Sequence, residues 1–405
     1  MKALHAASGD RYRKEVNFPR LTRLLQSGVG WRKKRKRFLM VVIDHQVPTP
    51  DCDAGSRSTW HYIQLFLKMG MEVKFIADNF QTPEPYTTQL RELGVEVLSD
   101  GGNHAAMQQW LVEHRADVRC IFTNRPSTTK HYLEAFRGMH QTTILYYGHD
   151  LAFVRIQRRF ALSGDPADAK SAVTVEKLEM KIWQQADAVY YPSTTETDIV
   201  LTRLPHVRAR TLPLFLLEPQ DIRYEENLAQ RRDLIFVGAF GHHPNRDAVT
   251  WFLDHCWPVI EKALPGVCFY IVGRDRTDAM QQRASDRVIV TGWLSEDDLT
   301  ALYRRSRMAV VPLRYGAGVK GKVVEAMHHH LPVVMTTISG EGLPNIAGIA
   351  LFADAPNAFA QSVIDLYSDE TRLIQLGNAG GEYVARHFSP ERAWKVIFQD
   401  IPHDL

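Results

Sequence analysis

The sequence is poor in cysteine and lacks any long apolar run. Its four cysteines, Cys52, Cys120, Cys256 and Cys268, form no CxxC or Cys/His metal spacing, which argues against a zinc motif and favours a reducing compartment. No apolar stretch approaches the ~20 residues that span a bilayer, and the first residues lack the apolar core of a secretion signal. We therefore expect a cytoplasmic protein, either free or peripheral on the inner face of a membrane.

A strong excess of one charge is also lacking. The formal net charge is +3, which gives no reason to expect a nucleic-acid partner. Much of the basic excess is local, because residues 32–37 are all lysine or arginine. Trp31 and other apolar residues precede this run at near-helical spacing. Residues 1–37 thus form a basic arm, either a solvated extension or a surface helix that rests on anionic lipid.

The 405 residues favour two domains, each with its own core. Short apolar runs alternate with helical stretches, as in parallel α/β sheets, and the pattern breaks at Pro205, Pro213 and Pro219. We expect strands at 38–43, 72–76, 95–98, 120–123, 143–147 and 188–191, then at 233–237, 268–272, 288–291, 308–313, 332–336 and 349–352. The prediction is an N-terminal domain (38–210), a C-terminal domain (211–387) and a C-terminal helix (388–405) that could pack back on the N-terminal domain.

Two such doubly wound domains leave a crevice where the carboxyl ends of their sheets face each other, and ligands bind at such edges. The most informative segment, residues 315–327, lies between a predicted strand and a helix. Its glycines, including Gly318 and Gly321, let the backbone approach a ligand, and a helix N-terminus favours phosphate. Lys320 and Lys322 add positive charge, and Glu325 offers a carboxylate to ribose hydroxyls.

This segment also matches two other templates. It satisfies the GxxxxGK part of a P-loop, but Val323 stands where Ser or Thr must supply the magnesium ligand. It satisfies GxGxxG of a dinucleotide site as well, yet the next predicted strand ends without the acid that should hold the ribose. The dinucleotide enzyme remains a minor alternative.

Several short motifs occur together in the order typical of one family. They are Phe236-Val237-Gly238, Pro244-Asn245-Arg246-Asp247-Ala248, Ile271-Val272-Gly273, Val290-Thr291-Gly292-Trp293, the KxKxxEAM segment and Leu331-Pro332-Val333-Val334. Over residues 233–355 the chain thus resembles glycosyltransferase family 4. The N-terminal half, with Asp53-Ala54-Gly55-Ser56-Arg57 and Gly148-His149-Asp150-Leu151, resembles bacterial members that build surface polysaccharides such as the O-antigen of lipopolysaccharide.

The resemblance implies a GT-B fold, a hexosyltransferase-type activity that retains the anomeric configuration, and no obligatory metal or other cofactor. The co-substrate is a nucleotide-diphosphate sugar, and the acceptor is a glycan or a lipid-linked glycan. Carried over by position, Glu325 binds the ribose, Lys320 and Lys322 the diphosphate, and Trp293 with Leu294 flanks the base. The further donor-side residues are Arg246, Gly318, Gly321, Gly340 and Glu341.

On the N-terminal side, the resemblance places His149, with Asp150 beside it, near the donor sugar as the candidate catalytic pair. Gly55 and Arg57 are candidates for contact with donor phosphate or acceptor. Simpler readings stay open: His149 as a capping residue, Asp53 or Ser56 as only a helix N-cap, and Trp293 as a packing residue. The three histidines at 328–330 cannot share one ion on a helix and indicate a solvated helix end.

The chain departs from the family pattern at two positions. Ala317 stands where a glutamate is frequent, eight positions before Glu325, and Ala239 stands where many members have a basic residue. The lysine pair and Arg246 could supply the missing charge. The first departure keeps open a non-catalytic GT-B partner or glycan-binding protein, and a sugar-nucleotide epimerase is a further alternative.

Overall fold

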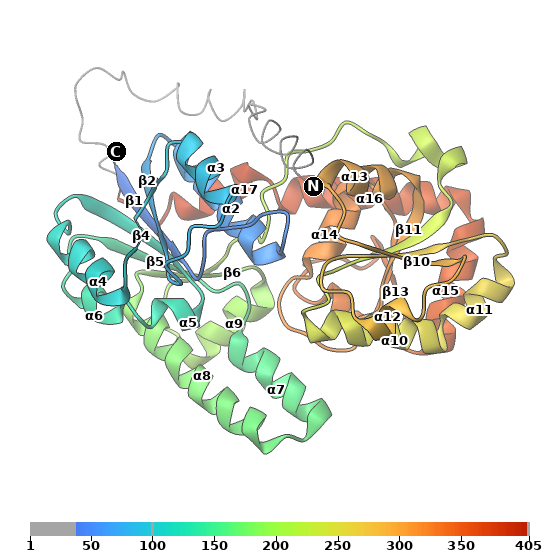
Figure 1. Ribbon diagram of the computed structural model, residues 1–405, viewed down its shortest axis with the longest axis horizontal. Coiled ribbons are helices and arrows are strands. Elements are labelled where there is room, and N and C mark those ends of the chain that lie inside the picture. Colours follow the sequence, from blue (N-terminus) through green and yellow to red (C-terminus); the bar gives the residue numbers. More distant parts are fainter. Residues whose placement is uncertain (1–37, 99–100, 403–405) are drawn as a thin grey trace.

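The computed structural model describes residues 38–98 and 101–402, which form two α/β domains side by side (Figure 1). The basic arm predicted for residues 1–37 lies outside the described residues. Every strand pairing in both sheets is parallel. The expectation of two doubly wound α/β domains is confirmed.

The N-terminal domain is built on a seven-stranded sheet with the order β3-β2-β1-β4-β5-β6-β7. Its strands are β1 (Leu39–Asp44), β2 (Glu72–Ala77), β3 (Glu96–Val97), β4 (Val118–Asn124), β5 (Thr143–Tyr147), β6 (Ala188–Tyr191) and β7 (Ala209–Thr211). Its helices are α2 (Ala54–Lys68), α3 (Tyr86–Glu92), α4 (His104–Glu113), α5 (Pro126–Thr129), α6 (Leu133–Arg137), α7 (Ala152–Ser163), α8 (Pro166–Gln185) and α9 (Thr194–Arg203). The helices α7 and α8 form a hairpin that projects from the domain (Figure 1).

The C-terminal domain has a six-stranded sheet with the order β10-β9-β8-β11-β12-β13. Its strands are β8 (Asp233–Val237), β9 (Phe269–Val272), β10 (Val288–Gly292), β11 (Ser306–Val311), β12 (Val333–Met335) and β13 (Leu351–Phe352). Its helices are α10 (His243–His255), α11 (Trp257–Ala263), α12 (Asp278–Gln281), α13 (Glu296–Arg305), α14 (Gly321–His328), α15 (Pro356–Ser368) and α16 (Glu370–His387), with 3₁₀ turns η1 (Tyr224–Gln230) and η2 (Thr337–Gly340).

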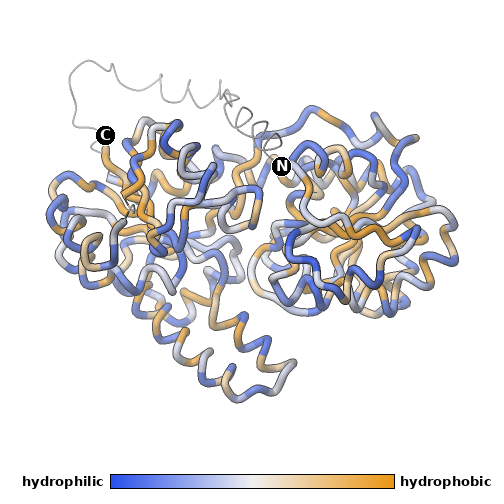
Figure 2. The backbone as a smooth tube through the Cα atoms, viewed as in Figure 1, coloured by the Kyte–Doolittle hydropathy of each residue, from blue (hydrophilic) through white to orange (hydrophobic). Residues whose placement is uncertain are grey.

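Hydrophobic strands form the centre of each domain, because both faces of the sheets are covered (Figure 2). In β1, the sequence LMVVID is buried along its whole length. Such continuous apolar runs are typical of parallel sheets with helices on both faces. The cores fix the sheets, and the loops at the carboxyl ends of the strands are left to form a site.

The chain passes between the domains twice. The segment after β7 leads into the C-terminal domain, and the segment after α16 leads back. A hydrogen bond joins these two segments, because Leu217 N donates to Phe388 O at 2.8 Å. The last helix, α17 (Pro390–Ile397), buries Ala393 and Ile397 in the core of the N-terminal domain. The C-terminal helix therefore packs on the N-terminal domain.

Two details differ from the expectations, and a third identifies the N-cap of α2. The edge strand β7 was not predicted, and its sequence, ART, is only half-buried. Helix α2 begins at Ala54, because Asp53 caps it by accepting Ser56 N at 2.9 Å. The expectation of a solvated helix end at 328–330 is wrong for His330, which is buried and whose ring leaves no room for a side chain at Gly381.

Candidate active site

The carboxyl edges of the two sheets meet at an interdomain junction. The contacts across it come from loops and helices that follow strands in both domains. Side chains link them as follows: Arg57 NH1 donates to Glu325 Oε1, Arg158 to Glu341 and to Gly316 O, Arg274 NH2 to Cys52 O at 3.1 Å, and Trp293 Nε1 to Asp51 O at 3.4 Å. Candidate residues predicted from both halves of the sequence therefore lie at one place.

The N-termini of two helices meet at this junction. Gly321 is the first residue of α14 and Ala54 the first of α2. A Cβ on Gly321 would lie 2.8 Å from Cζ of Phe215 and 3.4 Å from Cβ of Ala54, so only glycine allows this approach. Free N–H groups and positive dipole ends favour an anion at such a position.

Two lysines stand beside the start of α14. Lys320 is 7% exposed, and burial lowers its pKa to about 8. Burial and the neighbouring Lys320 also lower the pKa of Lys322 to about 8. Lys322 Nζ donates to Asn245 Oδ1 at 2.9 Å, and Asn245 Nδ2 donates to Ala239 O at 2.7 Å. Two partly desolvated cations held this close together are suited to a diphosphate.

Asn245 was not predicted as a site residue, although its motif was recognised. Its amide group bonds Ala239 O in the loop after β8 and, at the same time, accepts from Lys322, so it holds both in place. Arg246, which was predicted, donates through NH1 to Phe240 O at 2.6 Å and so organises the same loop. The residues that follow β8 and β9 also pack closely, because a Cβ on Gly273 would lie 1.8 Å from Gly238 O.

Glu325 lies one turn into α14 and is paired with Arg57 of α2. Arg57 Nε also donates to Pro50 O at 3.0 Å. Gly55, in the first turn of α2, makes room for a different arginine: a Cβ there would lie 2.2 Å from the NH2 atom of Arg125. Asp53 is the N-cap of α2. Packing against Arg125 accounts for the glycine at position 55, and this contact gives no evidence that Gly55 touches a ligand.

His149 follows β5 by two residues at the carboxyl edge of the N-terminal sheet. Asn124 Nδ2 donates to Ile43 O at 2.9 Å, so Asn124 Oδ1 is left to accept from His149 Nε2 at 3.2 Å. This network assigns the proton to Nε2. Among the described residues, Nδ1 of His149 is buried and has no partner. Burial, with a contribution from Arg125, lowers the pKa of His149 well below its usual value, so the ring is neutral.

Arg125 and Asp44 form an ion pair behind His149, in which Asp44 is buried and the Arg125 side chain is 25% exposed; sequence reasoning missed both as site residues. Arg125 Nε donates to Asp44 Oδ1 at 2.9 Å, and Thr59 Oγ1 donates to Asp44 Oδ2 at 2.6 Å. Burial alone would raise the pKa of Asp44, but Arg125 holds it well below the usual range. Arg125 has φ of 61°, a backbone conformation that a non-glycine residue rarely adopts and that often marks a functional site.

Asp150 and Glu196 face the glycine-rich loop of the other domain. A Cβ on Gly318 would lie 3.2 Å from Glu196 Oε1, 3.3 Å from Asp150 Cβ and 3.4 Å from His149 O. Asp150 Oδ2 accepts from Arg155 Nε. Burial raises the pKa of Glu196 to about 8, and Glu196 was not predicted as a site residue. The loop that carries Ala317 thus lies against carboxyl groups from the N-terminal domain.

Glu341 follows the turn η2, where Gly340 is packed against the ring of Phe352. It pairs with Arg158, and Lys320 Nζ lies 3.7 Å from its Oε2. These cations lower the pKa of Glu341 despite its partial burial, which acts in the opposite direction. Gly342 has φ of 80° and lies against Ser193 of the N-terminal domain. Glu341 therefore belongs to the junction, with its charge already balanced.

Trp293 directly follows β10 and is 50% exposed, so it is not a core residue. Leu294 is partly buried against the C-terminal core. An exposed indole at a strand end can stack on a flat ring, as a base-flanking role requires.

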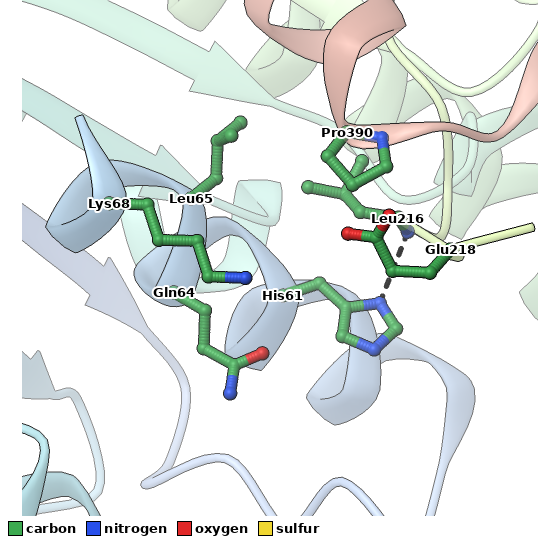
Figure 3. Close-up of a pocket in the computed structure, with 7 residues that line it drawn as sticks. All are labelled: His61, Gln64, Leu65, Lys68, Leu216, Glu218 and Pro390. Atoms are coloured by element: carbon green, nitrogen blue, oxygen red, sulfur yellow. Dashed lines mark hydrogen bonds between the residues drawn. The ribbon is translucent and has the colours of Figure 1, made fainter. Parts of the chain in front are cut away.

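A separate pocket of about 110 Å³ lies at the crossover between the domains. Figure 3 shows side chains from α2, the linker and the start of α17 around it, and its lining comprises His61, Gln64, Leu65, Lys68, Leu216, Glu218 and Pro390. Leu216 N donates to His61 Nδ1 at 3.1 Å (Figure 3). Drug-sized ligands occupy pockets of roughly 300–1,000 Å³, so this pocket is too small for a nucleotide sugar.

Among the described residues, no helix has the length and apolar character needed to cross a membrane.

Comparisons with known proteins agree with this arrangement. Residues 231–369 match the family described as glycosyl transferases group 1. A protein in the cps region of Klebsiella pneumoniae, described as an uncharacterized 44.6 kDa protein, is 22% identical over 197 residues, which are 47% of this chain. The chain matches only about half of that relative's length, 51%.

Solved glycosyltransferase structures resemble most of the chain. Sucrose-phosphate synthase from Thermosynechococcus elongatus is 20% identical with a TM-score of 0.64, covering 90% of this chain and 98% of its own. TarM, known from S. aureus, is 9% identical with a TM-score of 0.70, and the match covers 89% of this chain and 98% of TarM. HepE from Anabaena, in complex with UDP-glucose, is 14% identical with a TM-score of 0.64, covering 90% and 99%. The chain therefore has the GT-B fold, and its C-terminal domain carries the group 1 glycosyl transferase signature.

Proposed function

We propose that this protein is a retaining, hexosyltransferase-type glycosyltransferase of the family 4 type. It transfers a sugar from a nucleotide-diphosphate sugar to a glycan or lipid-linked glycan in the synthesis of a cell-surface polysaccharide. The observation that carries the proposal is the meeting of the N-termini of α2 and α14 beside Lys320 and Lys322. This arrangement is suited to a diphosphate held between two domains.

The donor is held mainly by the C-terminal domain. Lys320 and Lys322 bind the diphosphate, Glu325 accepts hydrogen bonds from the ribose, and Trp293 with Leu294 flanks the base. For Glu325 to reach the ribose, its pairing with Arg57 must be exchanged, and Arg57 Nη1 can then bond the diphosphate instead of Glu325. Donor binding and the interdomain contact are thereby coupled.

In the transfer, the bond between the anomeric carbon and the diphosphate oxygen breaks, and the acceptor oxygen bonds to the same carbon on the same face. The acceptor's proton passes to the leaving diphosphate, so a nucleoside diphosphate and the glycosylated acceptor are the products. No protein nucleophile is needed. The protein positions the sugar and stabilises the developing charge.

His149 and Asp150 act on the sugar from the N-terminal side. Because His149 is neutral and protonated on Nε2, its Nδ1 is an acceptor for a sugar hydroxyl. Asp150 and Glu196 provide carboxyl groups beside Gly318, next to the position where Ala317 replaces the family's glutamate. Together they supply polar contacts on the sugar side.

The relatives suggest where to look for substrates. HepE was solved with UDP-glucose, and TarM with UDP and fondaparinux, so uridine diphosphate sugars are the first donors to test. The relative in a cps region supports a role in polysaccharide synthesis.

The experiment is a panel of nucleotide sugars incubated with purified protein, with and without lipid-linked glycan acceptors, analysed by chromatography and mass spectrometry. Acceptor-dependent release of nucleoside diphosphate and an α-configured product from an α-configured donor are expected. A donor that changes configuration without acceptor would point to an epimerase. Donor binding without any turnover would leave a non-catalytic GT-B protein.

For the basic arm, the proposal is a peripheral contact with anionic lipid. A chain lacking residues 1–37 should stay folded but sediment less with anionic vesicles, and added salt should weaken binding of the full chain. Equal sedimentation of the two forms would exclude this role.

A further inference from the structure

Three potential metal ligands lie together at the end of β2, and none of them is assigned to donor binding. Asp78 directly follows β2, His104 is the first residue of α4, and His131 lies in the turn between α5 and α6. His104 Nε2 lies 2.9 Å from Asp78 Oδ1, and His131 Nδ1 lies 2.9 Å from Asp78 Oδ2. The three ligand atoms all lie within 4.8 Å of one another.

Neighbouring groups hold the backbone and the rings of the cluster. Asp78 N donates to Asp44 O at 2.8 Å, which extends the β1–β2 pairing by one residue. The His104 ring packs edge-on against Phe80, and its centroid lies 4.1 Å from that of the His131 ring. Gln108 of α4 donates to the carbonyl of His131. The cluster is therefore held by the sheet, a helix and a turn at once.

The donor set has a definite preference among cations. Two imidazole nitrogens with one carboxylate oxygen suit zinc and related first-row divalent ions, whereas Mg²⁺ and Ca²⁺ prefer oxygen ligands. With bonds of about 2.0–2.2 Å, tetrahedral zinc ligands lie roughly 3.3 Å apart. Both rings reach the same carboxylate oxygen, Asp78 Oδ1, which lies 2.9 Å from His104 Nε2 and 3.1 Å from His131 Nδ1, so only a small outward shift of the two rings is needed.

The surroundings leave a coordination position open. The side chains of His104 and His131 are 41% and 32% exposed, while that of Asp78 is 12% exposed. Tyr132 lies beside them, its hydroxyl buried and without a hydrogen-bond partner among the described residues. The phenol of Tyr132 can bond the carboxylate or a water on the ion.

We propose that Asp78, His104 and His131 bind one divalent transition-metal ion, with zinc the best match, and a solvent molecule in the fourth position. The ion would tie the end of β2 to α4 and to the α5–α6 turn on the acceptor-side domain. None of its three ligands is among the residues assigned to the diphosphate, so we give the ion a structural role and no part in the departure of the leaving group.

The test is calorimetric titration of Zn²⁺ into the full-length, chelator-treated protein without an affinity tag. One equivalent should bind to the wild type, and its affinity should fall by roughly 100-fold or more in His104→Ala and His131→Ala. Asp78→Asn, nearly isosteric, should weaken it too while circular dichroism stays unchanged. The control is His114→Ala, whose ring stacks on Trp110 outside the cluster.

Co²⁺ provides a second readout, because a site with few ligands gives strong visible absorption that a hexahydrated ion does not. Zn²⁺ should also raise the Tm of the wild type and of His114→Ala, but not of the cluster variants. Equal stoichiometry and affinity in the wild type and all three cluster variants would overturn the proposal. None of these readouts depends on glycosyl transfer.

Discussion

Arg57 of the N-terminal domain donates a hydrogen bond to Glu325 of the C-terminal domain, and this pair joins the first turns of α2 and α14. The two side chains are 25% and 17% exposed, so the pair is partly desolvated. The same carboxylate is the one expected to hold the ribose. The contact between domains and the binding of donor therefore compete for one group, and closing of the domains can respond to the donor.

Replacing Glu325 should reveal this shared role. Glu325→Gln removes a charged acceptor from the ribose and should weaken binding of nucleoside diphosphate by about 1.5–3 kcal/mol, roughly 10- to 150-fold. Isothermal titration with UDP, or with whichever nucleotide the panel selects, measures it. Glu382→Gln, at a 63% exposed surface position paired with Arg223, is the matched control. Wild-type affinity in Glu325→Gln would remove Glu325 from the donor site.

The diphosphate assignment rests on Lys322, which is held by Asn245. Lys322→Ala should weaken nucleoside-diphosphate binding by about 1–3 kcal/mol, the scale of a charge-assisted bond to phosphate. The affinity for the corresponding nucleoside should change much less, because a nucleoside has no phosphate for Lys322 to contact. Lys181→Ala on the exposed face of α8 serves as control. An unchanged diphosphate affinity would refute the assignment.

The lowered pKa values of Lys320 and Lys322, both about 8, predict a pH dependence. Each lysine is charged below this pH and loses its proton above it, so the attraction for diphosphate is complete near pH 7 and declines as the pH rises through 8. A bound diphosphate raises both pKa values, so affinity should fall by up to roughly tenfold per pH unit and per lysine between pH 8 and 10. Affinity that stays flat to pH 10 would contradict the burial of these charges.

Much of the fold followed from sequence pattern, because most strands are continuous apolar runs. The bounds of β5, β6 and β8 were predicted to the residue, since each run is largely buried and is followed by a glycine or a proline. Strand β7 has neither property, because only its position at the sheet edge makes it a strand. The local sequence pattern cannot predict an edge strand whose structure depends on pairing with a neighbouring strand.

The candidate site was only partly accessible from the sequence. Lys320, Lys322 and Glu325 lie in one glycine-rich segment that can be read directly. Arg125 and Glu196 lie in no such motif. Arg125 stands out by its φ of 61°, and Glu196 stands out by its contact with Gly318. The cluster of Asp78, His104 and His131 is spread over 54 residues of sequence and forms only when the sheet aligns β2 with β4.

Chelation should leave glycosyl transfer intact. The groups at the start of α14 are lysines and backbone amides, which neutralise a leaving diphosphate without a cation. Among the described residues, the group of three that could hold a metal lies at β2 instead. Initial rates with EDTA at moderate temperature should equal those without it, whereas Tm should drop if the β2 site was loaded. Activity lost in EDTA and restored by Mg²⁺ or Mn²⁺ would show a metal-dependent transfer.

The last prediction concerns His149, whose unpartnered Nδ1 is an acceptor for a sugar hydroxyl. Nucleotide affinity comes mainly from Lys320, Lys322 and Glu325 in the other domain. The contact from His149 instead gains strength as the sugar ring develops positive charge, because its neutral nitrogen carries a lone pair that stabilises a more acidic hydroxyl. His149→Ala should therefore lower kcat by roughly 10²-fold or more and leave the Kd for nucleotide nearly unchanged.

Two further variants separate catalysis from packing around His149. Asn124→Ala removes the acceptor that fixes the ring, and it should lower kcat by less than His149→Ala does, since the imidazole itself remains. His140→Ala, on an exposed turn of the same domain, should behave as wild type. Because the imidazole is neutral throughout the assay range, the loss in His149→Ala should be constant from pH 6 to 8. Turnover equal to wild type, or a loss explained wholly by weaker donor binding, would make His149 a structural residue of the β5 edge.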